Sequence, residues 1–358
     1  MSYDALTPYA ESERALWTLS TSACIGVMRL LVLGGTHHVG RAVVEAALAR
    51  GDEVSTVTRG LSGRPADGVD ARYADRRDVA AVAAALGEDT WDAVLDTWSF
   101  EPAAVRDAAR MLSGRARHYT YISSRSVYTW PMVPGFDESA PVVDASPDST
   151  DAGDYAAAKR GAEIALLNGF DGDVLIARAG LILGPYEVVG RLPWWLNRIA
   201  AGGRVPAPGP GDRPLQYLDG RDLAEWTLRC AGAGTTGTFN TVSEPGHTTI
   251  AALLDRCAEV TGSPAELVWL TPDAIEAAGV SGWTNLPIWV PPTGELAGLH
   301  ACDASAAFAA GLLCRPAEET VADTWAWLQR EGTPTPPTGR GGDLGLSSEQ
   351  EERLLAAS

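Results

Sequence analysis

The sequence predicts an α/β protein with a doubly wound parallel sheet and a smaller C-terminal lobe. Three observations lead to this prediction. From Met28 onward, short apolar runs alternate with Ala-rich amphipathic stretches, a pattern that indicates parallel strands joined by right-handed helical crossovers. A glycine-rich turn separates the first apolar run from the first amphipathic stretch. After Pro185 the alternation weakens and Trp- and Pro-rich sequence follows.

The apolar runs are short enough to be buried strands, and the amphipathic stretches are long enough to be helices. Ligands of such sheets bind beyond the carboxyl ends of the strands, so functional residues are expected in the loops that follow them. The predicted strands are 29–35, 53–59, 69–74, 91–98, 117–124 and 173–182, and the predicted helices are 39–51, 77–86, 101–112 and 154–168.

The chain is expected to divide into a sheet domain and a substrate-binding lobe. Residues 1–27 precede the first strand and are predicted to be a disordered extension or an upstream start. The sheet domain spans 28–184, with later returns near 213–245, and the lobe is formed mainly by 185–330, with helices at 248–261 and 317–330. Residues 331–358 are predicted to be a linker and a terminal helix.

Composition excludes several classes of function. The formal net charge of −18 argues against a broad nucleic-acid surface. No apolar run reaches the roughly 18 residues of a membrane span, and the N-terminus lacks a signal-peptide pattern. The five cysteines are scattered without a C-x-x-C pair. We therefore expect no metal site, and we expect the thiols to be reduced. We therefore expect a cytoplasmic protein with a small-molecule partner, without nucleic acid or membrane partners.

The segment "LLVLGGTHHVGRAVVEAAL" indicates a strand, a glycine turn and a helix in that order. Gly34 permits the tight turn, and Gly40 lets the helix pack close to the strand. The start of the helix offers free N–H groups and a partial positive charge to a pyrophosphate. The residues predicted to bind a dinucleotide here are Gly34, Thr36, His37, His38, Val39 and Gly40.

The residue after the second strand predicts which dinucleotide is bound. An acidic residue there suits a free ribose hydroxyl, whereas an arginine suits a 2′-phosphate. Arg59 holds this position, so NADP(H) is favoured and NAD(H) stays the alternative, with His37 or Arg41 as further phosphate contacts. Asp75, after the third strand, is predicted either to bind the adenine amino group or to cap the next helix.

"GDYAAAKRGAE" contains Lys159, the only lysine of the chain, four residues after Tyr155. On a helix the two side chains share one face. A tyrosine hydroxyl titrates near pH ~10, and lowering its pKa to about 7 requires about 4 kcal/mol of differential stabilisation. An ammonium beside an oxidised nicotinamide can supply it, and its compact charge suits this role better than a guanidinium.

Two serines, Ser123 and Ser124, are predicted at the carboxyl end of the fifth strand, in "YISSRSVY". A hydroxyl in this position can donate to a substrate oxygen while the tyrosine exchanges the proton. Serines at a strand end also form turns, so either role fits this stretch.

Together, "GGTHHVG", "YISSRSVY" and "YAAAK" make the chain resemble an extended or atypical short-chain dehydrogenase/reductase of the NAD-dependent epimerase/dehydratase family, from about Met28 to the C-terminal helix. The resemblance implies a Rossmann domain, a nicotinamide cofactor that Lys159 also contacts, and a catalytic set of Ser124, Tyr155 and Lys159. His37 replaces the middle glycine of the family motif. Leu215 stands where sugar-nucleotide enzymes have an arginine, with Arg213 two residues earlier, which disfavours a nucleotide-sugar substrate.

The 12 tryptophans suggest an aromatic substrate pocket with few charges, suited to an apolar or aromatic small molecule. Core filling is the alternative for each of them. The predicted pocket residues are Trp98, Trp130, Tyr186, Trp194 and Trp195, with Trp283 and Trp289 as further candidates.

We therefore expect an NADPH-dependent reductase that transfers hydride to a carbonyl or conjugated double bond of a small metabolite. The alternative is an epimerase or dehydratase that keeps its cofactor and returns the hydride. A cofactor sensor or RNA-binding relative is a third interpretation, which the Tyr155/Lys159 pair and the negative charge oppose. A homodimer is also expected.

Overall fold

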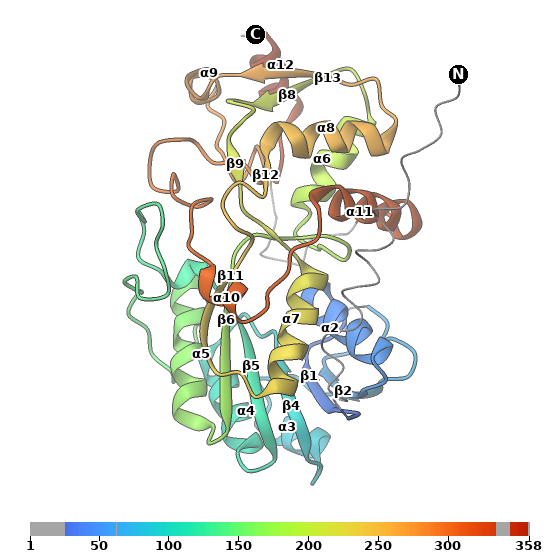
Figure 1. The fold of residues 1–358 in the computed structure, drawn as a ribbon, viewed down its shortest axis with the longest axis vertical. Coiled ribbons are helices and arrows are strands. Elements are labelled where there is room, and N and C mark those ends of the chain that lie inside the picture. The colour runs from blue at the N-terminus through green and yellow to red at the C-terminus, as the bar shows by residue number, and fades with distance from the viewer. Residues whose placement is uncertain (1–25, 62, 334–343, 357–358) are drawn as a thin grey trace, which may run out of the picture.

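We describe the fold from a computed structural model that covers residues 26–61, 63–333 and 344–356. Most of the predicted N-terminal extension and of the predicted linker lies outside these residues. Figure 1 shows the two parts of the molecule, with the sheet and its helices below and a second, smaller lobe above.

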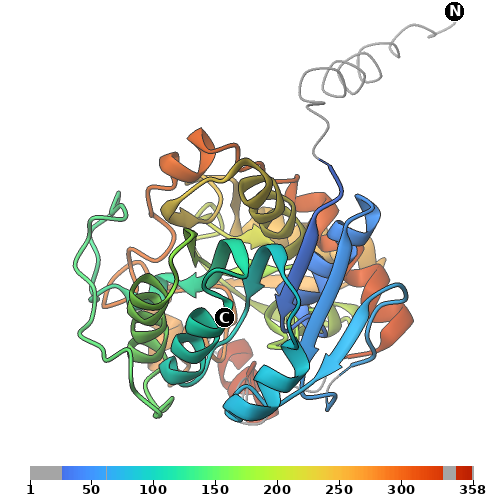
Figure 2. The same ribbon diagram turned by 90° about the horizontal axis from the view of Figure 1, so that it is seen from below.

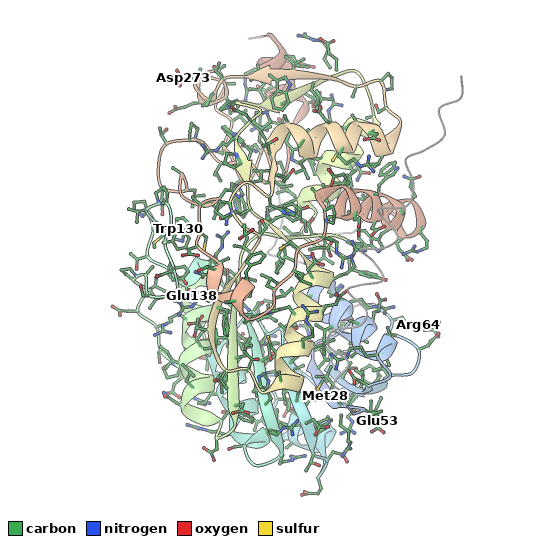
Figure 3. The ribbon with its side chains drawn as sticks, in the orientation of Figure 1. Met28, Glu53, Arg64, Trp130, Glu138 and Asp273 are labelled. Carbon is green, nitrogen blue, oxygen red and sulfur yellow. The ribbon has the colours of Figure 1, made fainter. Side chains whose placement is uncertain are left out.

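Within the described residues, seven parallel strands form the central sheet, which confirms the predicted fold class. The chain order reverses between β1 and β4, where sheets of this kind open a crevice for ligands. Figure 3 places Met28, directly before β1, in the lower part of the molecule, so the parallel strands run upward and their carboxyl ends face the upper lobe. The strand order is β11 (Gly237–Thr241), β6 (Asp173–Ala179), β5 (Ala116–Ser124), β4 (Trp91–Asp96), β1 (Arg29–Leu33), β2 (Glu53–Thr58) and β3 (Asp70–Tyr73).

Helices cover both faces of the sheet. Alternate side chains of β1 enter different cores, because successive residues of a strand point to opposite faces: Leu30 and Val32 pack with α2 and α7, whereas Leu31 and Leu33 pack with the helices of the other face. Figure 2 shows the layers from below. One face carries α2 (His38–Ala49) and α7 (Gly220–Ala233), and the other α3 (Val79–Leu86), α4 (Pro102–Leu112) and α5 (Tyr155–Gly169).

The upper lobe has a hydrophobic core of its own, which includes the buried side chains of Trp195 and Trp289. The prediction of Trp195 as a pocket residue is wrong, because its ring fills this core and its Nε1 donates to the Pro287 carbonyl at 2.8 Å. The lobe consists of α6 (Arg191–Ala200), α8 (Ile250–Thr261), α9 (Pro272–Ala277), α11 (Ala317–Glu331) and α12 (Ser348–Ala356), with the strand pair β8 (Arg204–Pro208) and β13 (Glu266–Leu270).

Short elements connect the sheet to the lobe. They are η1 (Arg125–Val127), α10 (Ser305–Ala309), the parallel pair β7 (Ile182–Leu183) and β10 (Leu218–Asp219), and the antiparallel pair β9 (Pro214–Leu215) and β12 (Thr248–Thr249).

No helix of the described residues is both long and apolar enough to cross a membrane.

Candidate active site

Two adjacent cavities lie at the carboxyl edge of the sheet. The larger, about 650 Å³, is lined from the sheet side by Ser124 and Tyr155 and from the lobe side by Trp283. The smaller, about 180 Å³, lies at the glycine turn. Both are lined by Ser99 and Phe100, so they adjoin at the loop after β4. Figure 3 shows Trp130, another wall residue of the larger cavity, level with the boundary between the sheet and the upper lobe.

The glycine turn has the close approach that its sequence predicts. Gly34 and Gly35 have φ of 127° and 114°, a region that favours glycine. A Cβ on Gly40 would lie 2.7 Å from the backbone nitrogen of Gly35, so only glycine lets α2 begin so close to the turn. The first turn of α2 carries no acidic residue. These features fit the pyrophosphate of a dinucleotide.

The two histidines of the turn face different cavities. His37 is the N-cap residue of α2 and lines the smaller cavity with Thr36. His38 lines the larger one, and burial lowers its pKa to about 4, so its ring is neutral at physiological pH. Val39 belongs to the hydrophobic core between α2 and the sheet.

Of the two residues predicted to bind the adenosine part of the dinucleotide, Arg59 lines the smaller cavity and Asp75 does not. Arg59 is exposed and lines the smaller cavity, whose lining residues include no Asp or Glu. Asp75 does not line this cavity, and its carboxylate accepts a hydrogen bond of 3.0 Å from the backbone N–H of Arg77. The alternative that Asp75 caps α3 is wrong, because Asp78 is the residue that caps it.

A buried ionic cluster that the sequence analysis missed lies behind the smaller cavity. Asp96, at the end of β4, accepts two hydrogen bonds from Arg76, at 3.0 and 2.9 Å, and one of 2.7 Å from the Tyr119 hydroxyl. Asp96 also accepts a hydrogen bond of 2.9 Å from the backbone N–H of Trp98. The Arg76 guanidinium lies over the ring of the same tryptophan, 5.3 Å from the ring centre. Trp98, predicted in the substrate pocket, lines the smaller cavity instead.

Tyr155 and Lys159 lie one turn apart at the start of α5. Tyr155 is the first residue of the helix, is 40% exposed and lines the larger cavity. Lys159 is only 2% exposed, and its Nζ donates to the carbonyls of Trp98 at 2.7 Å and Ile122 at 2.6 Å. The same ammonium lies 4.7 Å from the ring centre of Tyr121. Lys159 therefore joins α5 to β5 and to the loop after β4.

The two serines at the end of β5 have different partners. Ser123 is buried and donates 2.6 Å to Glu163, which also holds the guanidinium of Arg178 through two hydrogen bonds of 3.0 Å. Ser124 lines the larger cavity, where its hydroxyl donates 3.1 Å to Ser126. Of the two serines, only Ser124 lines the larger cavity.

Charged groups complete the wall of the larger cavity, so the expectation of few charges is wrong. Glu187 accepts the backbone N–H of Arg191 at 2.7 Å and of Leu192 at 3.2 Å, yet burial raises its pKa to about 7. The Arg191 guanidinium lies 4.5 Å from the ring centre of Trp283; burial lowers its pKa, while Glu187 and Tyr155 oppose that shift.

Two other predicted pocket residues do not line the larger cavity. The Tyr186 hydroxyl donates 2.9 Å to Glu45 on α2, and Trp194 packs edge-on against Trp195, with ring centres 4.7 Å apart. Across the residues described, no group of three or more His, Cys, Asp or Glu side chains could hold a metal ion.

Comparison with solved structures shows the same fold at low sequence identity. The Bordetella bronchiseptica enzyme WbmH in complex with NAD⁺ is 19% identical, covers 86% of this chain and 100% of its own, and has a TM-score of 0.65. The Thermotoga maritima UDP-glucose 4-epimerase with UDP-glucose is 17% identical, covers 85% of this chain and 99% of its own, and has a TM-score of 0.61. No curated protein matches the chain significantly.

The sequence itself matches a protein family over the whole sheet domain. The match spans residues 30–241, from β1 to the end of β11, and includes the glycine turn, Ser124, Tyr155 and Lys159. Because this is more than half of the chain, the protein belongs to the NAD-dependent epimerase/dehydratase family.

Proposed function

We propose that this chain oxidises a secondary alcohol carbon of a small substrate with a bound nicotinamide dinucleotide and returns the hydride to the same substrate, as an epimerase or dehydratase. One observation carries the proposal: Ser124 and Tyr155 line a cavity of about 650 Å³ that adjoins the cavity at the glycine turn. Membership of the family favours hydride return over the net reduction expected from the sequence.

Tyr155 is the proposed acid and base. Its phenolate oxygen takes the proton of the substrate hydroxyl as the carbon–hydrogen bond breaks, and the resulting phenol gives the proton back when the bond re-forms. Its place at the first residue of α5 puts it in the positive field of a helix N-terminus, and the guanidinium of Arg191 interacts with it across the cavity. Ser124 is proposed to donate to the same substrate oxygen and orient it.

Lys159 is proposed to support Tyr155 from below. Two of its three N–H donors are on the carbonyls of Trp98 and Ile122, so the ammonium is fixed rather than mobile. This fixed charge holds the helix start and the loop after β4 in place, which keeps the two cavities aligned. The predicted contact of Lys159 with the cofactor ribose stays a prediction.

A dinucleotide fits the smaller cavity and the glycine turn. Gly34, Gly35 and Gly40 give the close approach, and the residues proposed to line the ribose side are His37 and Arg59. A nicotinamide ring supplies hydride acceptance and return when it is bound. We propose NADP(H) over NAD(H), because Arg59 is present and no acidic side chain lines this cavity.

The same observation at Arg59 favours a second candidate function, the reductase expected from the sequence, because NADPH commonly serves net reduction. The substrate side does not favour a nucleotide sugar in either case. Leu215 is fully buried, and Arg213 donates to the carbonyls of Pro291 and Ala297 rather than lining the larger cavity.

The test separates hydride return from net reduction. We expect mass spectrometry of the full chain after denaturation to find NADP⁺ or NADPH released from it. A panel of secondary alcohols, deuterated at the carbinol carbon, would then be incubated with the protein and sub-stoichiometric NADP⁺. An enzyme that returns the hydride regenerates its NADP⁺, so it makes many turnovers and the deuterium stays in the product. A reductase that runs in reverse stops oxidising the alcohol once one equivalent of NADP⁺ has been reduced. Failure of NADP⁺ and NAD⁺ to bind would overturn both candidates.

A further inference from the structure

Arg125 is a buried cation without a counter-charge in the wall of the larger cavity. It is the first residue of η1, directly after Ser124, and is 2% exposed. Its Nε, Nη1 and Nη2 have no hydrogen-bond partner of ordinary geometry among the residues described. The guanidinium interacts with the Cys302 thiol, but no carboxylate of that part of the chain lies within ion-pair distance. Burying an unpaired guanidinium costs several kcal/mol, so such a group usually has a partner.

The other deeply buried arginines show what that partner is in this protein. Arg76 binds Asp96 through two hydrogen bonds, and Arg178 binds Glu163 in the same way. Each of these guanidinium groups thus binds a carboxylate in the two-pronged geometry that suits arginine best, and Glu163 also pairs with Arg160. Arg125 is equally buried and faces a cavity instead.

The surroundings of Arg125 do not neutralise it. Burial, together with the charge of the neighbouring Arg125, lowers the pKa of His300 to about 4. Burial raises the pKa of the Cys302 thiol, which Arg125 only partly offsets. Both groups are therefore uncharged at neutral pH. Gly180, also in the cavity wall, makes room for the guanidinium, because a Cβ there would lie 2.8 Å from Nη2 and 2.9 Å from Nε.

We propose that Arg125 binds a carboxylate of the substrate, so that the substrate is a hydroxy acid or keto acid. The statement that the bound carboxylate belongs to the substrate rests on the proposed function. A carboxylate supplies the negative charge and the two acceptor oxygens that Asp96 and Glu163 offer to the other two buried arginines. Ser124 and Arg125 are consecutive and line the same cavity, so the carboxylate lies within a few bonds of the carbon that Ser124 and Tyr155 serve.

The test uses two probes that differ only in the carboxylate. Mandelate and 1-phenylethanol are both aromatic secondary alcohols, and the second has a methyl group in place of the carboxylate. The melting temperature of the full chain would be measured with each, and with inorganic phosphate, at matched ionic strength. We expect mandelate to raise it and the other two not to.

Arg125→Met tests the residue itself. We expect its melting temperature without ligand to equal or exceed that of the wild type, because an unpaired buried cation is removed, and its mandelate affinity to fall about 10- to 100-fold. Arg110→Met, at an exposed site on α4, serves as control and should keep the mandelate response.

Three results would overturn the inference: a large loss of stability in Arg125→Met without ligand, an unchanged mandelate response in that variant, or stabilisation by phosphate instead of mandelate. A loss of NADP⁺ binding in Arg125→Met would also overturn it, by making Arg125 a cofactor residue. If mandelate has no effect while NADP⁺ still binds, this inference fails and the proposed function stands. If neither dinucleotide binds the wild type, the proposed function fails, whatever mandelate does.

Discussion

Lys159 donates a hydrogen bond of 2.7 Å to the carbonyl of Trp98, which lies 61 residues earlier in the loop after β4. The Tyr121 hydroxyl donates to the same carbonyl at 2.9 Å. The lone lysine therefore attaches the start of α5 to the loop after β4, where the two cavities adjoin.

Lys159→Met is expected to weaken this attachment. Loss of both hydrogen bonds should lower the free energy of unfolding by about 1–3 kcal/mol, because buried carbonyls lose a partner. It should also weaken NADP⁺ binding, since Trp98 lines the smaller cavity, where the dinucleotide is proposed to bind. Chemical denaturation and NADP⁺ titration measure the two effects. A variant with normal stability and normal cofactor affinity would contradict this role.

The neighbouring serines provide a matched pair of variants. Ser124→Ala should reduce turnover by about 10²- to 10³-fold at nearly unchanged stability, because Ser124 lines the larger cavity, where it is proposed to donate to the substrate oxygen. Ser123→Ala should do the reverse. It breaks a buried bond to Glu163, which costs about 1.5–3 kcal/mol, while turnover stays within a few-fold. Equal effects of the two variants on turnover would refute the assignment of Ser124.

Asp96→Asn should destabilise the protein strongly. It leaves the guanidinium of Arg76 buried without its charge partner, and such a break typically costs about 3–5 kcal/mol. The control is Asp67→Asn, because Asp67 pairs with Arg64 on the surface with side-chain exposures of 94% and 88%. That change should alter stability by less than about 0.5 kcal/mol. Urea denaturation of both variants checks the contrast; similar losses would contradict it.

The stability of the protein should depend on pH through Glu187. Burial raises the pKa of this carboxyl from 4.5 to about 7, so the folded state binds more protons than the unfolded state between these values. The contribution of this group to the free energy of unfolding is therefore fully present below pH 4.5. It falls by about 3 kcal/mol as the pH rises through about 7. Glu187→Gln should flatten this part of the profile of unfolding free energy against pH. An identical profile in the variant would rule the group out.

Much of the fold could be predicted because parallel sheets give strong local patterns. The six predicted strands and the helices between them follow from apolar runs and glycine turns, and β1 to β6 lie where these runs do. The seventh strand, β11, was missed. Its sequence GTFNT has no apolar run, and it is a strand because it pairs with β6 at the edge of the sheet.

The catalytic candidates could be found because Tyr155 and Lys159 are close in sequence. The residues missed are those whose roles depend on contacts distant in sequence, such as Arg76 with Asp96 and the lobe groups Glu187 and Arg191. Arg125 was passed over although it follows Ser124 directly, since its sequence does not show that it is buried or that it lacks an acidic partner.

The most direct test follows the reduction of bound NADP⁺ in a single turnover of wild-type protein, Tyr155→Phe and Tyr73→Phe, with the secondary alcohol that performs best in the panel. Tyr73 is 59% exposed on β3 and serves as the control. We predict that Tyr155→Phe binds NADP⁺ normally but reduces it about 10²- to 10⁴-fold more slowly, and that Tyr73→Phe behaves as the wild type. Wild-type rates in Tyr155→Phe would contradict the assignment of Tyr155 as the proton donor and acceptor.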